Sequence, residues 1–222
     1  MRRTLIGTCA LALILYVAAP CSAGVITASG AGSTIATAED LTGLYPSEIQ
    51  GVMNGDPNDV NIFKILILDS WNFSALTVDA GAHGIQDTVL SLFDSSGTGI
   101  YLNDDISGSS FFSCLPSQGL SNPCSTVRGT LLAGVYYLAI SQGANYPLDS
   151  LGNEIFTGSS TDLLTADPSA GVLASWDGGS FTSPDGDSVN YDIELTGTVP
   201  EPATWLLTAG AVLMLGRLRR RR

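Results

Sequence analysis

The sequence predicts an all-β protein, an antiparallel β-sandwich of jelly-roll type, flanked by a terminal helical segment at each end. Three observations predict it. Short runs of β-forming residues recur through the middle of the 222-residue chain, and turn-forming residues separate them. Long helical periodicity is scarce in this middle part. Each end of the chain instead carries an apolar run next to arginines.

The first 23 residues have the three parts of a secretory signal peptide. Arg2 and Arg3 precede the apolar run 5–19, and the small residues Cys21 and Ala23 stand just before Gly24. This order is typical of a segment that signal peptidase removes. We therefore expect residues 1–23 to direct export as a helical signal and to take no part in the fold.

Residues 24–198 are the expected β-sandwich, and their number suits a single domain. Turns such as 94–97 and 177–179 separate the strand-like runs. The expected strands are residues 60–68, 71–78, 88–93, 100–102, 126–132, 135–141, 172–176 and 189–195. About eight short strands with such turns favour two antiparallel sheets packed face to face, as in a jelly roll.

Two of these runs show which side chains should be buried. Phe63, Ile65 and Ile67 alternate with a second set of side chains that are only partly covered. In residues 189–195, Tyr191, Ile193 and Leu195 alternate with polar residues, which predicts a strand with one face in the core and the other in solvent.

Charge is strongly segregated along the chain. The whole chain has a formal net charge of -12, but residues 24–199 hold twenty acidic residues and only Lys64 and Arg128 as basic ones, a balance of -18. Such a domain repels nucleic acid and anionic lipid and attracts cations or basic surfaces. The same acidity also keeps a secreted domain soluble, so it does not identify a ligand by itself.

Two cysteines, Cys114 and Cys124, remain once the signal peptide is removed. In an exported protein such a pair predicts a disulfide. A bridge that closes a loop this short contributes roughly 2–3 kcal/mol. The alternative is a metal site, but two cysteines without a nearby histidine are a poor zinc site.

Acidic turns are the main candidates for a ligand site. Calcium takes six to eight oxygen ligands, which such loops can supply. The alternative is local turn chemistry, in which Asp and Asn bind their own backbone. Calcium is therefore the one cofactor that the sequence allows for, with the candidate ligands Asp56, Asn58, Asp59, Asp87, Asn103, Asp104 and Asp105.

The sequence favours a protein that is not an enzyme. His83 is the single histidine, it lies in a glycine-rich turn, and the chain has no Gly-x-Ser-x-Gly nucleophile motif. The aromatic residues Trp71, Trp176, Tyr101 and Tyr146 could stack on sugars. Aromatic residues on strands are more often core residues, and the sequence alone does not separate these two roles.

Residues 199–222 predict a membrane tail. The uncharged run 203–216 forms a helix of ~21 Å, shorter than a bilayer core of ~30 Å. Extension to Leu218 makes a transmembrane helix 203–218, because Arg217 can reach the headgroups. The arginines then mark the cytoplasmic side and leave the domain outside. They are Arg217, Arg219, Arg220, Arg221 and Arg222.

The tail resembles a PEP-CTERM sorting signal, because Pro200, Glu201 and Pro202 precede the apolar helix and the arginine cluster. The resemblance implies processing by an exosortase near this motif. The domain would first be tethered to the inner membrane facing the periplasm, and would then pass to the cell surface or the extracellular polysaccharide. The alternative is an uncleaved membrane anchor.

The middle of the chain resembles PPC-like domains, the bacterial pre-peptidase C-terminal domains. The resemblance rests on DVNIF at 59–63, DTVLSLFD at 87–94 and LAGVYYLAI at 132–140, with NDD at 103–105 between the last two. It implies a non-catalytic β-sandwich that binds a substrate or matrix, or assists secretion. The stretches 107–125 and 142–171 depart from the family pattern.

The expected function is therefore a structural or adhesive role at the cell surface or in the extracellular matrix. The expected partners are signal peptidase, an exosortase, the inner membrane and a surface polysaccharide, with no nucleic acid. One alternative is a calcium-dependent carbohydrate-binding module. A second is a secreted hydrolase that uses His83 or the acidic loops.

Overall fold

A computed structural model describes residues 24–54, 56, 58–81, 83–115, 131–179 and 188–199. All of them lie in one compact unit, Ser22–Pro200. The predicted signal peptide, sorting motif, transmembrane helix and terminal arginines lie outside these residues. Within the described part of the chain, no helix has both the length and the apolar character that a membrane crossing requires.

The described residues form thirteen strands and one turn of 3-10 helix, η1 (Ile35–Thr37). The strands are β1 (Gly24–Thr27), β2 (Glu39–Asp40), β3 (Pro46–Met53), β4 (Val60–Ile67), β5 (Ser74–Val78), β6 (Thr88–Asp94), β7 (Gly99–Asn103), β8 (Cys114–Leu115), β9 (Gly134–Gln142), β10 (Pro147–Leu148), β11 (Leu164–Thr165), β12 (Ser175–Trp176) and β13 (Val189–Thr196).

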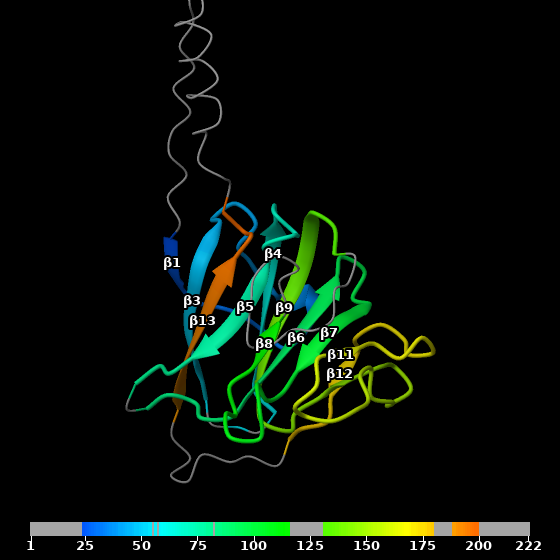
Figure 1. Cartoon of the computed structure of the whole chain (residues 1–222). Helices are drawn as coiled ribbons and strands as arrows, with labels where there is room; N and C mark the ends of the chain where they lie inside the picture. The colour runs from blue at the N-terminus through cyan, green and yellow to red at the C-terminus, as the bar shows by residue number, and fades with distance from the viewer. Residues whose placement is uncertain are drawn as a thin grey trace, which may run out of the picture. The chain divides into compact units, whose positions relative to one another are not determined.

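The strands make two main sheets (Figure 1). Sheet A has the order β1-β3-β13-β5-β8, and sheet B has the order β11-β7-β6-β9-β4-β2, while β10 and β12 form a separate pair. The all-β prediction is confirmed. The prediction of purely antiparallel sheets is wrong at one edge of each sheet, because β1 pairs in parallel with β3 and β2 pairs in parallel with β4.

The main core lies between the two sheets. The alternation predicted from the sequence is confirmed: Phe63, Ile65 and Ile67 on β4 belong to one buried cluster with Tyr191, Ile193 and Leu195 on β13. The side chains between the latter three point away from the core, so β13 is buried on one face only. Burial of these apolar faces is the main force that holds the sheets together.

A second hydrophobic core lies on the outer face of sheet B. We define the arm as residues 146–177, which contain β10, β11 and β12. Ile155 and Phe156 of the arm pack on side chains of sheet B, and the Phe93 ring lies 6.0 Å from the Phe156 ring and 6.4 Å from the Trp176 ring in edge-on contacts. The arm explains why β6 is buried on both faces.

The structure also shows where strand prediction was inaccurate. Strand β3 was missed, because it begins at Pro46 and contains Glu48, Gln50 and Gly51 among its apolar residues. The predicted strand 71–78 begins only at Ser74, since the Asp69 carboxylate accepts hydrogen bonds from two backbone N–H groups, those of Trp71 and Asn72, in a turn. Most of the predicted strand 126–132 lies outside the described residues.

Candidate functional site

Three aspartates meet where β6 begins and β7 ends. The two strands are antiparallel neighbours, with Leu90 opposite Asn103. Asp87 precedes β6 and Asp104 and Asp105 follow β7, so this register brings them to the same end of the pair. We call these three residues the acidic cluster. One carboxylate oxygen from each lies within 4.8 Å of the others.

Asp104 is the most buried member of the acidic cluster. Its side chain is 6% exposed, and the Tyr146 hydroxyl donates a hydrogen bond of 2.6 Å to its Oδ2 atom. Its Oδ1 atom is buried and has no hydrogen-bond partner. A buried carboxylate oxygen without a donor is costly, so this atom marks the point where an additional positive group would be most stabilising.

The electrostatics of the cluster favour a cation. Burial, together with Asp105 and Asp87, raises the pKa of Asp104 to about 6, although the hydrogen bond from Tyr146 opposes the rise. Burial and the negative charge of Asp105 also raise the pKa of Asp87. Burial and the neighbouring carboxylates raise the pKa of the Tyr146 hydroxyl, which therefore stays a donor. Neighbouring carboxylates that oppose each other's ionisation are a common property of metal sites.

The turn after β9 forms one wall of the cluster. The Gly143 N–H donates a hydrogen bond of 3.1 Å to the Asp87 backbone oxygen. The Asp87 carboxylate lies directly against Gly143, so that any side chain at 143 would overlap it. Next to it, Ala144 has a φ of 59°, a strained value for a residue with a side chain. The tight turn therefore holds Asp87 in place.

The other four predicted calcium ligands do not join the cluster. Asn103 has a structural role: its amide donates to the backbone oxygens of Asp105 and Asp162 and accepts from the Cys114 N–H. The Asp56 carboxylate accepts two hydrogen bonds from Asn58, and Asp59 accepts one from the Asn54 N–H. In this loop the structure shows the turn chemistry that the sequence left as an alternative.

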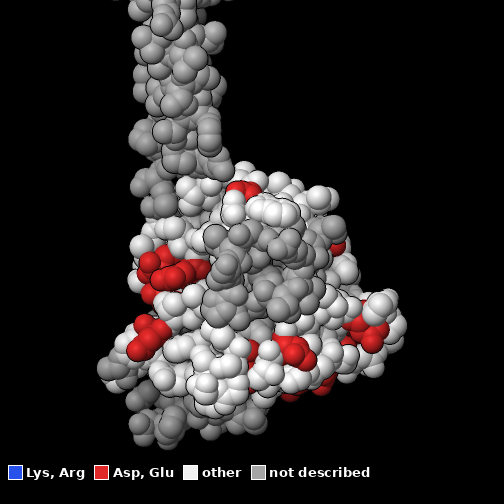
Figure 2. All heavy atoms as spheres, viewed as in Figure 1, with Lys and Arg blue, Asp and Glu red and all other residues white. Residues whose placement is uncertain are grey.

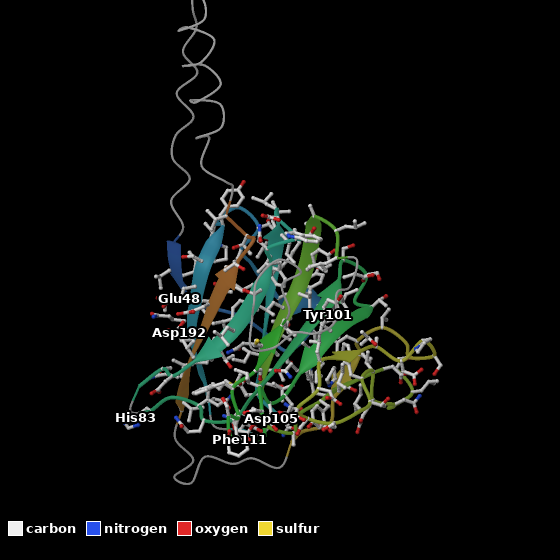
Figure 3. The ribbon with its side chains drawn as sticks, in the orientation of Figure 1. Glu48, His83, Tyr101, Asp105, Phe111 and Asp192 are labelled. Atoms are coloured by element: carbon white, nitrogen blue, oxygen red, sulfur yellow. The ribbon has the colours of Figure 1, made fainter. Side chains whose placement is uncertain are left out.

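The remaining predicted residues are dispersed. His83 is exposed on a loop, well away from Asp105 (Figure 3). Tyr101 is a core residue, and the Trp176 indole donates to the Ser33 backbone oxygen, whereas Trp71 is 55% exposed. Cys114 is buried and disulfide-bonded. Its predicted partner, Cys124, lies outside the described residues, so the pairing remains a prediction.

A second site candidate, which we call the sheet A groove, was not predicted. It is a hollow of ≈ 640 Å³ at β1, β3 and β13, a size typical of small-ligand sites. Sequence reasoning missed it because β3 itself was missed. The described residues that line it include no Lys, Arg or His. They are Thr27, Ala28, Ser29, Gly30, Ala31, Gln50, Gly51, Val52, Asn61, Asp79, Ala80, Asn190, Tyr191 and Asp192.

Asp192, which lines this groove, belongs to a group of neighbouring carboxylates on β3 and β13. Glu194 lies directly opposite Glu48 in the antiparallel pair β13–β3, and Asp192 lies beside Glu48 (Figure 3). The Gln50 amide donates 2.6 Å to Glu48 and 3.4 Å to Asp192, while the Asp192 Oδ1 atom has no partner. Partial burial and the charges of Glu48 and Glu194 raise the pKa of Asp192.

The described surface is acidic, and the view in Figure 2 shows several separate acidic patches and no basic atoms. Lys64 is the single Lys or Arg among the described residues, and it is paired with Asp40 at 2.9 Å. Hydrogen bonds from Thr42 and Lys64 lower the pKa of Asp40 to about 2. Neither the acidic cluster nor the sheet A groove therefore has a basic residue of the described chain as a partner.

The chain has no match among protein-family models and none among curated proteins. The resemblances to PEP-CTERM tails and PPC-like domains remain predictions that rest on the quoted motifs.

Proposed function

We propose that the protein is an exported component of the cell surface or extracellular matrix, with a non-catalytic β-sandwich in a structural or adhesive role. The observation that carries the proposal is the disulfide at Cys114 within a two-sheet domain. Structural disulfides persist in oxidising compartments outside the cytosol. This agrees with the signal peptide that residues 1–23 predict.

The pairing of the strands supports a jelly roll. Eight strands form nested antiparallel pairs, in which β3 pairs with β13, β4 with β9, β5 with β8 and β6 with β7. Among these eight strands, the first in the chain pairs with the last, the second with the second to last, and so on inward. This is the pairing of a long hairpin rolled into two sheets. Jelly rolls are frequent in lectin and capsid domains, which agrees with a binding or structural role.

Localisation follows from the tail. In this proposal, residues 200–202 and the helix predicted at 203–218 hold the domain at the outer side of the inner membrane until an exosortase cuts near Pro200–Pro202. The processed domain then joins the surface polysaccharide. The acidic body disfavours nucleic acid as a partner.

The sheet A groove is the surface that best suits adhesion. Its polar side chains, among them Thr27, Gln50 and Asn190, suit hydrogen bonding to a hydroxyl-rich polymer, and its carboxylates disfavour an anionic one. Gln50→Ala and Asn190→Ala should each reduce co-sedimentation of the protein with neutral surface polysaccharide from the host by several-fold. Exposed Leu151→Ala is the control that should leave co-sedimentation unchanged.

The first test of the proposal is the intact mass of the protein recovered from envelope and medium fractions of its host. Processed cargo should begin at Gly24 and end near Pro200–Pro202, with or without added mass. A form that still ends at Arg222 and remains in the inner membrane would contradict sorting and would make the tail an anchor.

A calcium-dependent carbohydrate-binding module is the second candidate, and the acidic cluster favours it. In that case a chelator would abolish glycan binding. A secreted hydrolase is the third: turnover of an ester, peptide or glycoside that is lost in His83→Ala would replace the non-catalytic proposal.

A further inference from the structure

We propose that Asp87, Asp104 and Asp105 bind one Ca²⁺ ion, and that the ion fastens the arm to the end of sheet B. The proposal rests on the geometry of these residues. It holds whether or not the protein is sorted to the surface and whether or not it binds a glycan.

The spacing of the carboxylates suits calcium. The three carboxylate oxygens lie within 4.8 Å of one another, so one divalent cation with oxygen ligands at about 2.4 Å can contact all three. Calcium accepts irregular sets of oxygen ligands, whereas magnesium demands near-ideal octahedral geometry and gives up its water reluctantly. An all-oxygen set without Cys or His disfavours zinc.

The buried Asp104 Oδ1 atom is an independent indication of a ligand. Asp104 and Asp105 are 6% and 9% exposed, so water can satisfy little of their charge. Tyr146 satisfies one Asp104 oxygen, and the other has no donor. A divalent cation would give that oxygen a partner and offset the repulsion between the three carboxylates.

The cluster lies at the base of the arm. One end of the arm begins at Tyr146, whose hydroxyl reaches Asp104 and whose N–H donates 2.8 Å to the Asp177 carboxylate. The Gly178 N–H donates 3.0 Å to the Asn145 side chain, which ties the two ends of the arm together. The Asp105 N–H donates 2.9 Å to the Ser160 oxygen of the arm.

An ion bound here would therefore hold four parts of the chain in a single arrangement: the start of β6, the end of β7, the turn after β9 and the arm. The arm covers the second core, so a change in how firmly its base is held should alter its rate of local opening.

The test compares the full-length chain with Asp104→Asn and with Asp167→Asn as a matched control. Asp167 belongs to the arm, but its exposed carboxylate accepts hydrogen bonds from the N–H and hydroxyl of Ser169. Asparagine at 104 keeps an oxygen that can accept from Tyr146 and removes one of the three charges. Calcium binding is measured by calorimetry and by thermal melting in chelator and in about 1 mM CaCl₂.

We expect one calcium site per chain and a rise in melting temperature of about 5–10 °C when calcium is near 100 times its dissociation constant. Asp167→Asn should keep the calcium site and the rise in melting temperature. Asp104→Asn should lose the site and the rise, yet in chelator it should melt no lower than the parent chain. This combination separates a metal ligand from a merely structural residue, whose loss would lower the melting temperature in chelator too.

Hydrogen exchange tests the fastening role. Amides of the arm should exchange several-fold more slowly in calcium than in chelator, and Asp104→Asn should remove the difference. Three results would overturn the proposal: no thermal shift at millimolar calcium, an equal shift with magnesium at the same concentration, or a shift that Asp104→Asn retains. An equal shift with magnesium would remove the assignment to calcium, and a shift that Asp104→Asn retains would mean that divalent ions only screen an acidic surface.

Discussion

Single acidic residues in this protein have contrasting environments, although the sequence presents them as one class. Asp40, Asp56 and Asp167 accept hydrogen bonds from nearby groups, which lower their pKa values. Asp104 and Asp192 each retain a buried oxygen without a donor, and their pKa values are raised. The raised pKa values depend on burial and on carboxylates that are distant in sequence, such as Asp87 for Asp104 and Glu48 for Asp192.

Asp192→Asn should stabilise the protein at neutral pH. Asp192 has a raised pKa in the folded state, so its protonated form favours folding. The stabilisation by protonated Asp192 is complete below the unfolded pKa of about 3.9 and is lost as the pH rises through the pKa of the folded state. Above the folded pKa, the negative charge of Asp192 beside Glu48 and Glu194 is destabilising. We expect a gain of about 0.3–1 kcal/mol at pH 7 and almost none at pH 3.5.

Urea unfolding at the two pH values measures this difference. Asp167→Asn is the control, because its pKa is lowered by Ser169, and it should not stabilise the protein at pH 7. Equal effects of Asp192→Asn at both pH values would show that the repulsion does not exist.

At the scale of elements, β3 shows how a polar strand becomes central. It pairs with β1 on one side and with β13 on the other, and its Ile49 and Met53 reach the main core. Gly51 is required at its position because the Tyr191 hydroxyl occupies the space where a side chain would stand. That hydroxyl accepts a hydrogen bond of 3.1 Å from the Asn61 amide, which links the two sheets.

Gly51→Ala should therefore destabilise the domain by about 1–3 kcal/mol, since the added methyl group must displace Tyr191. Gly43→Ala is the control, because a methyl group there meets nothing. Equilibrium unfolding in urea measures both changes. If Gly51→Ala proved as mild as Gly43→Ala, the contact between Tyr191 and β3 would be wrong.

The arm is an element whose stability depends on the second core. Phe156→Ala removes a ring that contacts Phe93 and should cost about 3–5 kcal/mol. Limited proteolysis should then cut the arm faster in the variant than in the parent chain. Leu151→Ala, at an 83% exposed position of the arm, should change neither measurement. Proteolysis first at other sites would mean that the arm is not the weak element.

At the scale of the whole molecule, the disulfide at Cys114 should raise the melting temperature. Reduction, or Cys114→Ser, should cost about 2–3 kcal/mol and lower the melting temperature by about 4–10 °C. Thiol labelling of the native protein with and without reductant, combined with mass mapping, would identify the partner. A labelled Cys124 in the native protein without reductant would exclude the Cys114–Cys124 pairing.

Much of the fold could be predicted from local pattern. The period-two alternation in residues 60–67 and 189–195 identified two central strands and their buried faces, because alternation directly reports which face meets the core. Edge strands such as β1, β2 and β11 were not predictable. They are two to four residues long, too short to show an alternation of their own. They are strands because they pair with a neighbouring strand.

For the candidate site, the sequence by itself determined the supply of acidic residues and named all three members of the cluster among its seven candidates. The sequence also predicts an export signal and a sorting tail, because such signals are linear patterns of residues. Only the tertiary structure decided which carboxylates meet. The register of β6 with β7 and the tight turn after β9 bring Asp87 to Asp104 and Asp105, whereas Asp56 and Asp59 are already satisfied by their own loop. The sheet A groove depended on tertiary structure entirely, since no local pattern records which strands become neighbours across a fold.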